Sequence, residues 1–137
     1  MLAALLSTMP LLMCMGYFFM GSLPLLVLKH DTPMDARFVR GFFNTYYLAV
    51  ACAATIPALA YALAGQLAFS LAMVAVAALA LLLRKVVLAR MDILRPRIEG
   101  ADATATLEFR RIHMAGMGIN MVQLVALVWG LFHVSPK

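Results

Sequence analysis

The chain has 137 residues, of which 65% are hydrophobic and 12% are charged, and its formal net charge is +5. Soluble globular domains contain about 25% charged residues, so the composition excludes an ordinary water-soluble domain and predicts that lipid surrounds the protein. The positive charge does not indicate a nucleic-acid partner, because every charged residue except Lys137 falls in two segments between apolar runs. Such placement is a membrane-topology signal.

The first apolar run covers residues 2–28 and is longer than a crossing needs, since about 20 helical residues span the hydrocarbon core. Pro10 and Pro24 each remove a backbone hydrogen-bond donor, which places the uninterrupted crossing at residues 10–28. No positively charged segment precedes the run. It is therefore interpreted as a retained transmembrane helix and not as a signal peptide.

A polar connection at residues 29–41 follows. Within it, Thr32 precedes Pro33, and this pairing predicts a helix start because threonine caps helix amino termini and proline is favoured in the first turn. The second crossing then occupies residues 42–64.

Two patterns predict how the second crossing packs. Tyr46 and Tyr47 near its start and Tyr61 near its end are expected to lie at the two membrane interfaces. Small residues recur at every fourth position, which predicts close approach of a neighbouring helix. These small residues are Ala54, Ala58 and Ala62.

Gly65 and Gln66 form the whole connection to the third crossing at residues 67–83. A connection this short predicts an antiparallel pair of helices. A basic segment at residues 84–111 comes next, and its first part is expected to continue the helix beyond the membrane. Pro96 is expected to end that helix.

The fourth crossing is predicted at residues 112–134, and Asp102 is expected to cap the approach to it. Ten of the eleven Lys and Arg residues fall in the connections at residues 29–41 and 84–111. The positive-inside rule places both connections in the cytoplasm and both termini outside. The sequence therefore predicts an all-α, polytopic bundle of four transmembrane helices. We expect the inner membrane of a bacterium, with both termini periplasmic.

Basic side chains in the longer connection are expected to contact anionic lipid head groups, each contact contributing about 1 kcal/mol. Their alternative role is to set the topology. The residues are Arg84, Lys85, Arg90, Arg95 and Arg97.

The fourth crossing carries strong hydrogen-bonding side chains on one face. At about 100° per residue, His113, Asn120 and Gln123 share a sector of roughly 80°, and Gly116 leaves a gap in it. Such groups are costly against lipid, so this face is expected to meet protein or a wet cavity. One interpretation is hydrogen bonding to neighbouring helices, and the other is a small cavity that binds a polar ligand or relays protons.

Two further patterns raise a cofactor as an alternative to the main expectation that none binds. His30 and His113 both lie at the cytoplasmic level, where they could ligate heme b axially or could simply be interfacial histidines. Met114 and Met117 offer thioethers suited to Cu(I), although methionine is also a packing residue. No acidic residue lies within a predicted crossing, which argues against a carboxylate-based ion pump.

Short patterns also give a family resemblance. Phe109-x-x-x-His113 is followed by Asn120 and Gln123, Arg95-Pro96-Arg97-Ile98 precedes it, and Phe43-x-x-Tyr46-Tyr47 opens the second crossing. With these patterns the chain resembles the transmembrane protein 205 family of small four-helix membrane proteins. The resemblance implies four helices with polar positions at His113 and Asn120, but no reaction. More distantly the layout is similar to copper-resistance D-like membrane proteins, some relatives of which bind heme.

The expected function is that of a non-enzymatic accessory or structural subunit. Membrane lipids, a second copy of the chain or a larger membrane complex are the expected partners, because little mass lies outside the membrane. The alternative is a heme- or copper-binding redox or transport protein that uses His30 and His113. A third hypothesis is a small-molecule permease that uses Asn120 and Gln123.

Overall fold

The computed structural model describes residues 2–27 and 29–133. In this part of the chain there are four helices and no strand. The helices are α1 (Leu2–Leu25), α2 (Pro33–Leu63), α3 (Leu67–Glu99) and α4 (Ala103–Phe132). Each is long and apolar enough to cross a membrane. The all-α, four-helix membrane fold predicted from the sequence is confirmed.

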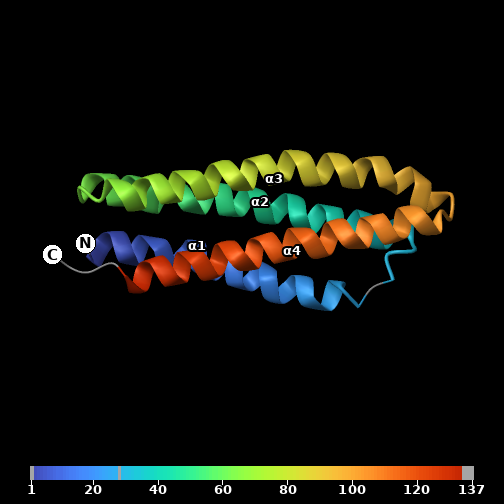
Figure 1. Ribbon diagram of the computed structural model, residues 1–137, viewed down its shortest axis with the longest axis horizontal. Helices are drawn as coiled ribbons and strands as arrows, with labels where there is room; N and C mark the ends of the chain where they lie inside the picture. The colour runs from blue at the N-terminus through green and yellow to red at the C-terminus, as the bar shows by residue number, and fades with distance from the viewer. Residues whose placement is uncertain (1, 28, 134–137) are drawn as a thin grey trace.

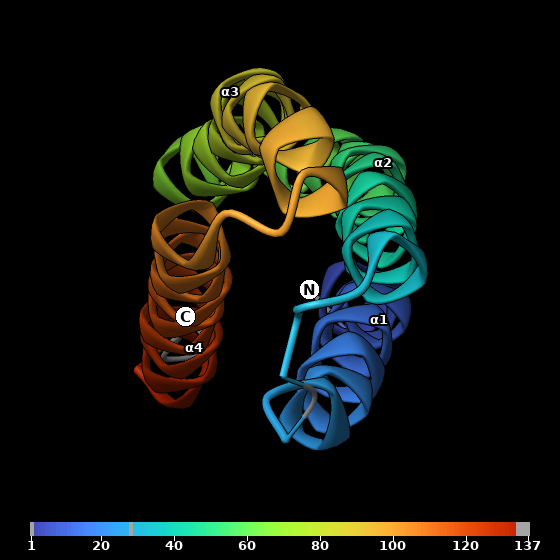
Figure 2. The ribbon, with the colours of Figure 1, turned by 90° about the vertical axis from the view of Figure 1, so that its right-hand side faces the viewer.

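The helices run alternately in opposite directions and follow one another around the bundle in chain order (Figures 1 and 2). α2 and α3 share the most extensive interface, and among the helices that are neighbours around the bundle (Figure 2) α1 and α4 share the smallest. The tight turn between α2 and α3 explains this difference, because Gly65 adopts a φ of 71° there. A left-handed backbone costs glycine little, so the two helices pair along their whole length.

Two predicted helix starts are confirmed. The Asp35 backbone N–H donates to Thr32 Oγ1 over 3.1 Å, and Pro33 opens α2. Asp102 caps α4, because its Oδ1 accepts from the Thr104 backbone N–H at 2.9 Å. At the other end of the chain, α1 passes through Pro10 without a break and ends at Leu25. The predicted end of the first crossing, Leu28, lies outside the described residues.

The prediction that Pro96 ends the third helix is wrong. α3 continues to Glu99, and residues 100–102 are the whole connection to α4. Pro96 lies in the last turn, where a proline removes one intrahelical donor without interrupting a following helix. Leu94 and Ile98 on either side of it are buried, so packing against the bundle holds this turn in place.

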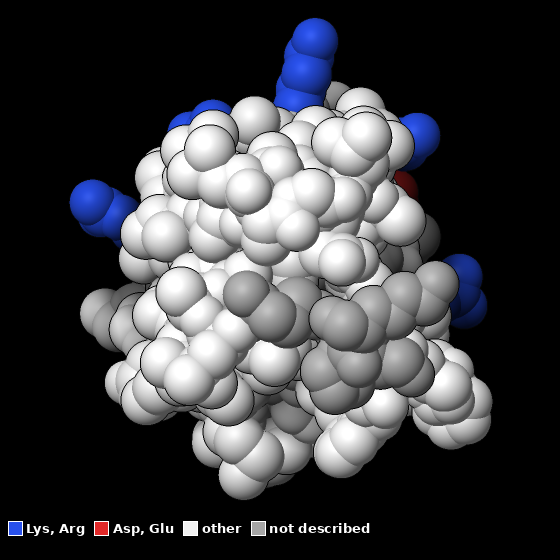
Figure 3. Space-filling model, turned by 90° about the vertical axis from the view of Figure 1, so that its left-hand side faces the viewer, with Lys and Arg blue, Asp and Glu red and all other residues white. Residues whose placement is uncertain are grey.

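The basic segment at residues 84–111 is therefore almost entirely helical. α3 has 33 residues, or about 50 Å of helix, against a hydrocarbon core of about 30 Å. Its basic half consequently projects past the apolar part of the bundle together with the first turns of α2 and α4. The opposite end, which carries the α2–α3 turn, faces the viewer in Figure 3, and there charged side chains are visible only at the outline, behind the uncharged residues of this end.

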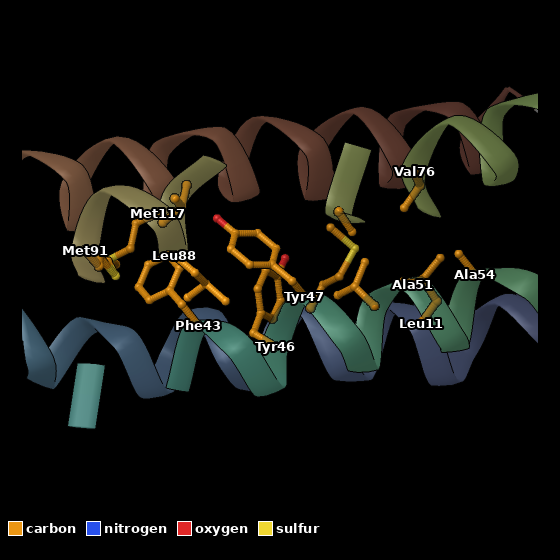
Figure 4. Packing of buried hydrophobic residues seen from close by; sticks show 14 of the residues in the cluster. Leu11, Phe43, Tyr46, Tyr47, Ala51, Ala54, Val76, Leu88, Met91 and Met117 are labelled. Carbon is orange, nitrogen blue, oxygen red and sulfur yellow. The ribbon is translucent and has the colours of Figure 1, made fainter. Parts of the chain in front are cut away.

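The prediction that three tyrosines lie at the membrane interfaces is wrong. Tyr46, Tyr47 and Tyr61 are all buried, and Figure 4 shows Tyr46 and Tyr47 among the core side chains. They share one stripe of α2 with Phe43 and Ala54, since these positions recur at helical spacing. Tyr61 contacts α1, where Thr8 Oγ1 donates to its hydroxyl oxygen over 3.3 Å.

Most of the predicted small-residue ridge packs against another helix of the same chain. Ala54 and Ala58 are buried, whereas Ala62 is exposed. Ser70 of α3 donates from Oγ to the carbonyl oxygen of Ala58 over 2.8 Å. Small side chains allow two helix backbones to approach closely, and the helix that approaches this ridge is α3 of the same chain.

Candidate functional site

Two buried histidines meet at the basic end of the bundle. Nε2 of His30 and Nδ1 of His113 are 3.0 Å apart and form a hydrogen bond, and neither residue has any exposed surface. His30 lies in the connection between α1 and α2, with a φ of 59°, and His113 lies in α4. The hydrogen bond therefore ties the α1–α2 connection to the last helix.

Aromatic rings enclose the histidine pair. The ring of Phe109 lies 5.8 Å from that of His30, and the ring of Phe43 meets His113 edge-on at 5.3 Å, measured between centroids. Nε2 of His113 has no hydrogen-bond partner among the described residues. A buried imidazole pair of this kind uses one nitrogen as donor and the other as acceptor, so it holds its two segments in one arrangement.

The pair does not fit an axial heme site in this arrangement. A heme iron bound by both residues must lie between their nitrogens, and the macrocycle must pass between the rings. Here the two nitrogens are in direct hydrogen-bond contact, and the ring centroids are only 5.2 Å apart. The structure thus brings the predicted histidines together, but without space for the macrocycle.

The two methionines proposed as Cu(I) ligands face different surroundings. Met117 is buried, whereas Met114 is about half exposed on the outer surface. Among the described residues, no group of three or more His, Cys, Asp or Glu side chains is placed to hold a metal ion. Met117 acts as a packing residue beside Phe43 (Figure 4).

The predicted polar face of α4 is divided between two environments. His113 and Asn120 point into the bundle, while Gln123 lines a groove between α3 and α4. The gap expected at Gly116 is occupied, because a Cβ there would lie 2.7 Å from Cε1 of Phe43. The ring of Phe43 thus packs directly against the backbone of α4 and separates His113 from Asn120.

A small cavity lies next to Asn120, between α1, α2 and α4. It offers about 10 Å³ to the centre of a water molecule, which is close to the space that one water needs. Asn120 and Tyr46 line it, and neither Asn120 Oδ1 nor Tyr46 Oη has a hydrogen-bond partner within the described chain. The remaining lining residues are Phe18, Phe19, Ser22, Phe42, Phe43 and Met117.

The sequence analysis did not predict that Tyr46 and Tyr47 lie near Asn120 inside the bundle. Tyr47 lies beside Asn120, although its hydroxyl completes no hydrogen bond among the residues that the structure describes. The available signal was the stripe that joins Phe43, Tyr47 and Tyr61 at helical spacing on α2. A stripe that continues into Ala54 indicates a core face and not a lipid interface.

Of the basic residues predicted to bind lipid head groups, three form a hydrogen bond or an ion pair with another side chain, and the other two form neither with any described side chain. Arg84 donates from Nε to Asn44 Oδ1 over 2.9 Å, and Arg97 forms an ion pair with Asp102 at 2.7 Å. Arg95 lies 3.7 Å from Asp92. Lys85 and Arg90 are exposed and form no ion pair with the described residues, so they are the members of the set available to lipid.

Comparison of the chain with protein-family models, with curated proteins and with solved structures gives no match. The four-helix fold is therefore known from the structure itself. The function has to be inferred from the contacts and surfaces of the described residues.

Proposed function

We propose that this chain is a non-enzymatic accessory subunit that packs laterally against another transmembrane helix, either in a larger membrane complex or in a second copy of the chain. We place it in a bacterial inner membrane, with both termini periplasmic and the basic helix ends in the cytoplasm. Short connections support this proposal, since residues 64–66 and 100–102 leave little mass outside the helices. The interior histidine pair then serves to hold the four helices in one arrangement.

An apolar groove on the outer surface between α3 and α4 carries the proposal. Its volume is about 510 Å³, and its lining contains no charged residue. Nothing lies within 4 Å of a Cβ added at Gly118, so the backbone of α4 is open to a neighbour there. Close backbone approach at small residues drives helix association in membranes. The lining residues are Leu79, Ala115, Gly118, Ile119, Val122, Gln123 and Ala126.

Gln123 supplies the polar contribution to this groove. Its Nε2 is shielded from the surface and has no hydrogen-bond partner in the described part of the chain. An unsatisfied amide at membrane depth is costly, and the terminal torsion of glutamine rotates readily. A neighbouring helix that presents a carbonyl or hydroxyl oxygen at the groove would satisfy this amide.

Gly118→Leu tests the proposal because a leucine side chain would fill the groove. Native mass spectrometry in a mild detergent should show oligomers or a co-purified subunit with the wild-type protein and monomer with Gly118→Leu. Gly130→Leu is the matched control, since Gly130 is equally open and lies on the same helix but does not line the groove. A wild-type protein that is monomeric and without a partner in every mild detergent contradicts the proposal.

The heme- or copper-binding alternative has a separate test. An absorption spectrum and elemental analysis of protein purified from its native membrane decide it. A Soret band or one copper ion per chain would favour the alternative. The permease hypothesis makes a different prediction, namely that Asn120→Leu abolishes flux in vesicles without changing assembly.

A further inference from the structure

A second groove lies on the outer surface between α1 and α2, toward the basic end of the bundle. Its volume is about 590 Å³, and four of its eight lining residues are aromatic. It differs from the α3–α4 groove because its lining includes one charged residue, Arg37. The other lining residues are Tyr17, Phe18, Met34, Phe38, Gly41, Phe42 and Thr45.

We propose that this groove binds one anionic phospholipid, with its phosphate on Arg37 and an acyl chain along the aromatic wall. The lining extends along α2 from Met34 to Thr45, which is about 16 Å of helix. Half of a hydrocarbon core is about 15 Å. With Arg37 at the level of the head groups, the wall from Arg37 to Thr45 is about 12 Å of helix, which covers most of the depth of one leaflet.

The positive charge of Arg37 favours an anionic phospholipid as the molecule bound in this groove. Arg37 is exposed and forms no ion pair with any described residue. One turn further along α2, Arg40 is already bound to Asp92 through two hydrogen bonds of 2.9 and 2.8 Å. Asp35 is separated from Arg37 by about 200° around the helix, so it does not neutralise the groove. A guanidinium binds phosphate oxygens in a bidentate manner.

The shape of the groove suits an acyl chain. Gly41 forms part of its floor, and a Cβ added there would meet no atom within 4 Å. Tyr17, Met34 and Phe38 are all more than half exposed along its edges. A neighbouring helix would bring a polar interaction to Arg37 only if it carried an acidic residue at head-group depth, whereas an anionic lipid always places its phosphate there.

Native mass spectrometry of the full chain with added phosphatidylglycerol or phosphatidylcholine, matched in acyl chains, tests the proposal. Wild-type protein should retain phosphatidylglycerol in preference to phosphatidylcholine. Arg37→Gln should reduce this preference about fivefold, because a head-group contact contributes about 1 kcal/mol. Gly41→Leu should reduce the binding of both lipids, because the added side chain occupies the path of the acyl chain.

Two controls make the result specific. Arg110→Gln removes an exposed arginine of α4, away from the groove, and Gly130→Leu adds a leucine at an open glycine that does not line the groove; both should bind lipid as the wild type does. Circular dichroism must show unchanged helicity for every variant compared. Equal retention of the two lipids by the wild type, or equal losses in Arg37→Gln and Arg110→Gln, would overturn the proposal. Dissociation of a dimer by Gly41→Leu, with lipid binding unchanged, would assign the groove to a second copy instead.

Discussion

Nε2 of His30 lies 3.0 Å from Nδ1 of His113, although the two residues are 83 positions apart in the chain. The contact joins the connection that follows α1 to the first half of α4, the last helix. Among the helices that are neighbours around the bundle (Figure 2), α1 and α4 otherwise share the smallest interface. The histidine pair is therefore the specific polar interaction that closes the bundle at its basic end.

Removal of one histidine should destabilise the bundle more than removal of both. His113→Leu leaves a buried imidazole without its hydrogen bond to α4, which should cost about 1–3 kcal/mol. The double variant His30→Leu/His113→Leu removes both polar groups and should lie closer to the wild type. Equilibrium unfolding in mixed micelles gives the coupling energy of the pair. Additive effects of the two single changes would contradict a direct hydrogen bond.

Gly116→Ala should destabilise the contact between α2 and α4. The added Cβ would lie 2.7 Å from Cε1 of Phe43 and 3.5 Å from the hydroxyl oxygen of Tyr47. Overpacking of this kind typically costs about 1–3 kcal/mol. Gly118→Ala is the matched control on the same helix, because nothing lies within 4 Å of its added Cβ. Thermal unfolding in detergent should separate the two variants, and equal melting temperatures would contradict the packing of Phe43 on Gly116.

Reversal of an ion pair tests the register of α2 and α3. Arg40 and Asp92 form two hydrogen bonds of 2.9 and 2.8 Å between these helices, and both side chains are partly exposed. Arg40→Asp should weaken unfolding stability by up to about 1 kcal/mol, and the swap Arg40→Asp/Asp92→Arg should restore part of it. Raising the salt concentration should shrink the difference between the wild type and Arg40→Asp. No recovery in the swapped variant would contradict the observed pairing.

The connection between α3 and α4 should loosen in acid. Hydrogen bonds from Arg97 and from the backbone of Ala105 and Thr104 lower the pKa of Asp102. A carboxylate with a lowered pKa contributes its stabilisation at neutral pH and loses it as the pH falls through this lowered native pKa. Hydrogen exchange of the Thr104 and Ala105 amides should therefore accelerate as the pH falls through that pKa.

Asp102→Asn removes the negative charge of this side chain but keeps a side-chain oxygen that can cap α4. Asparagine also accepts at an N-cap, so the start of α4 should persist while the acid-dependent change disappears. Asp102→Ala should accelerate amide exchange at every pH. The same acid dependence in Asp102→Asn would show that another group is responsible.

Rules that consider only adjacent residues predicted the helices and their starts well. They did not predict which side chains of each helix are buried. The caps at Thr32 and Asp102 depend on the chemistry of a few adjacent residues, and both were confirmed. Pro96 and the tyrosines of α2 were misjudged because their outcome depends on what packs against them. Burial of Leu94 and Ile98 keeps Pro96 inside α3, and the stripe that includes Phe43 turns Tyr47 toward the core.

The number of helices and the gathering of basic residues at one end followed from the sequence alone. In lipid, every backbone polar group must be satisfied within its own segment, so an apolar run of sufficient length becomes a helix whatever its neighbours are. Tertiary structure decided which side chains meet, because the rotation and offset of each helix depend on packing across the whole bundle. Because of this packing, His30 contacts His113, the ring of Phe43 lies against Gly116, and Arg37 lines an open groove.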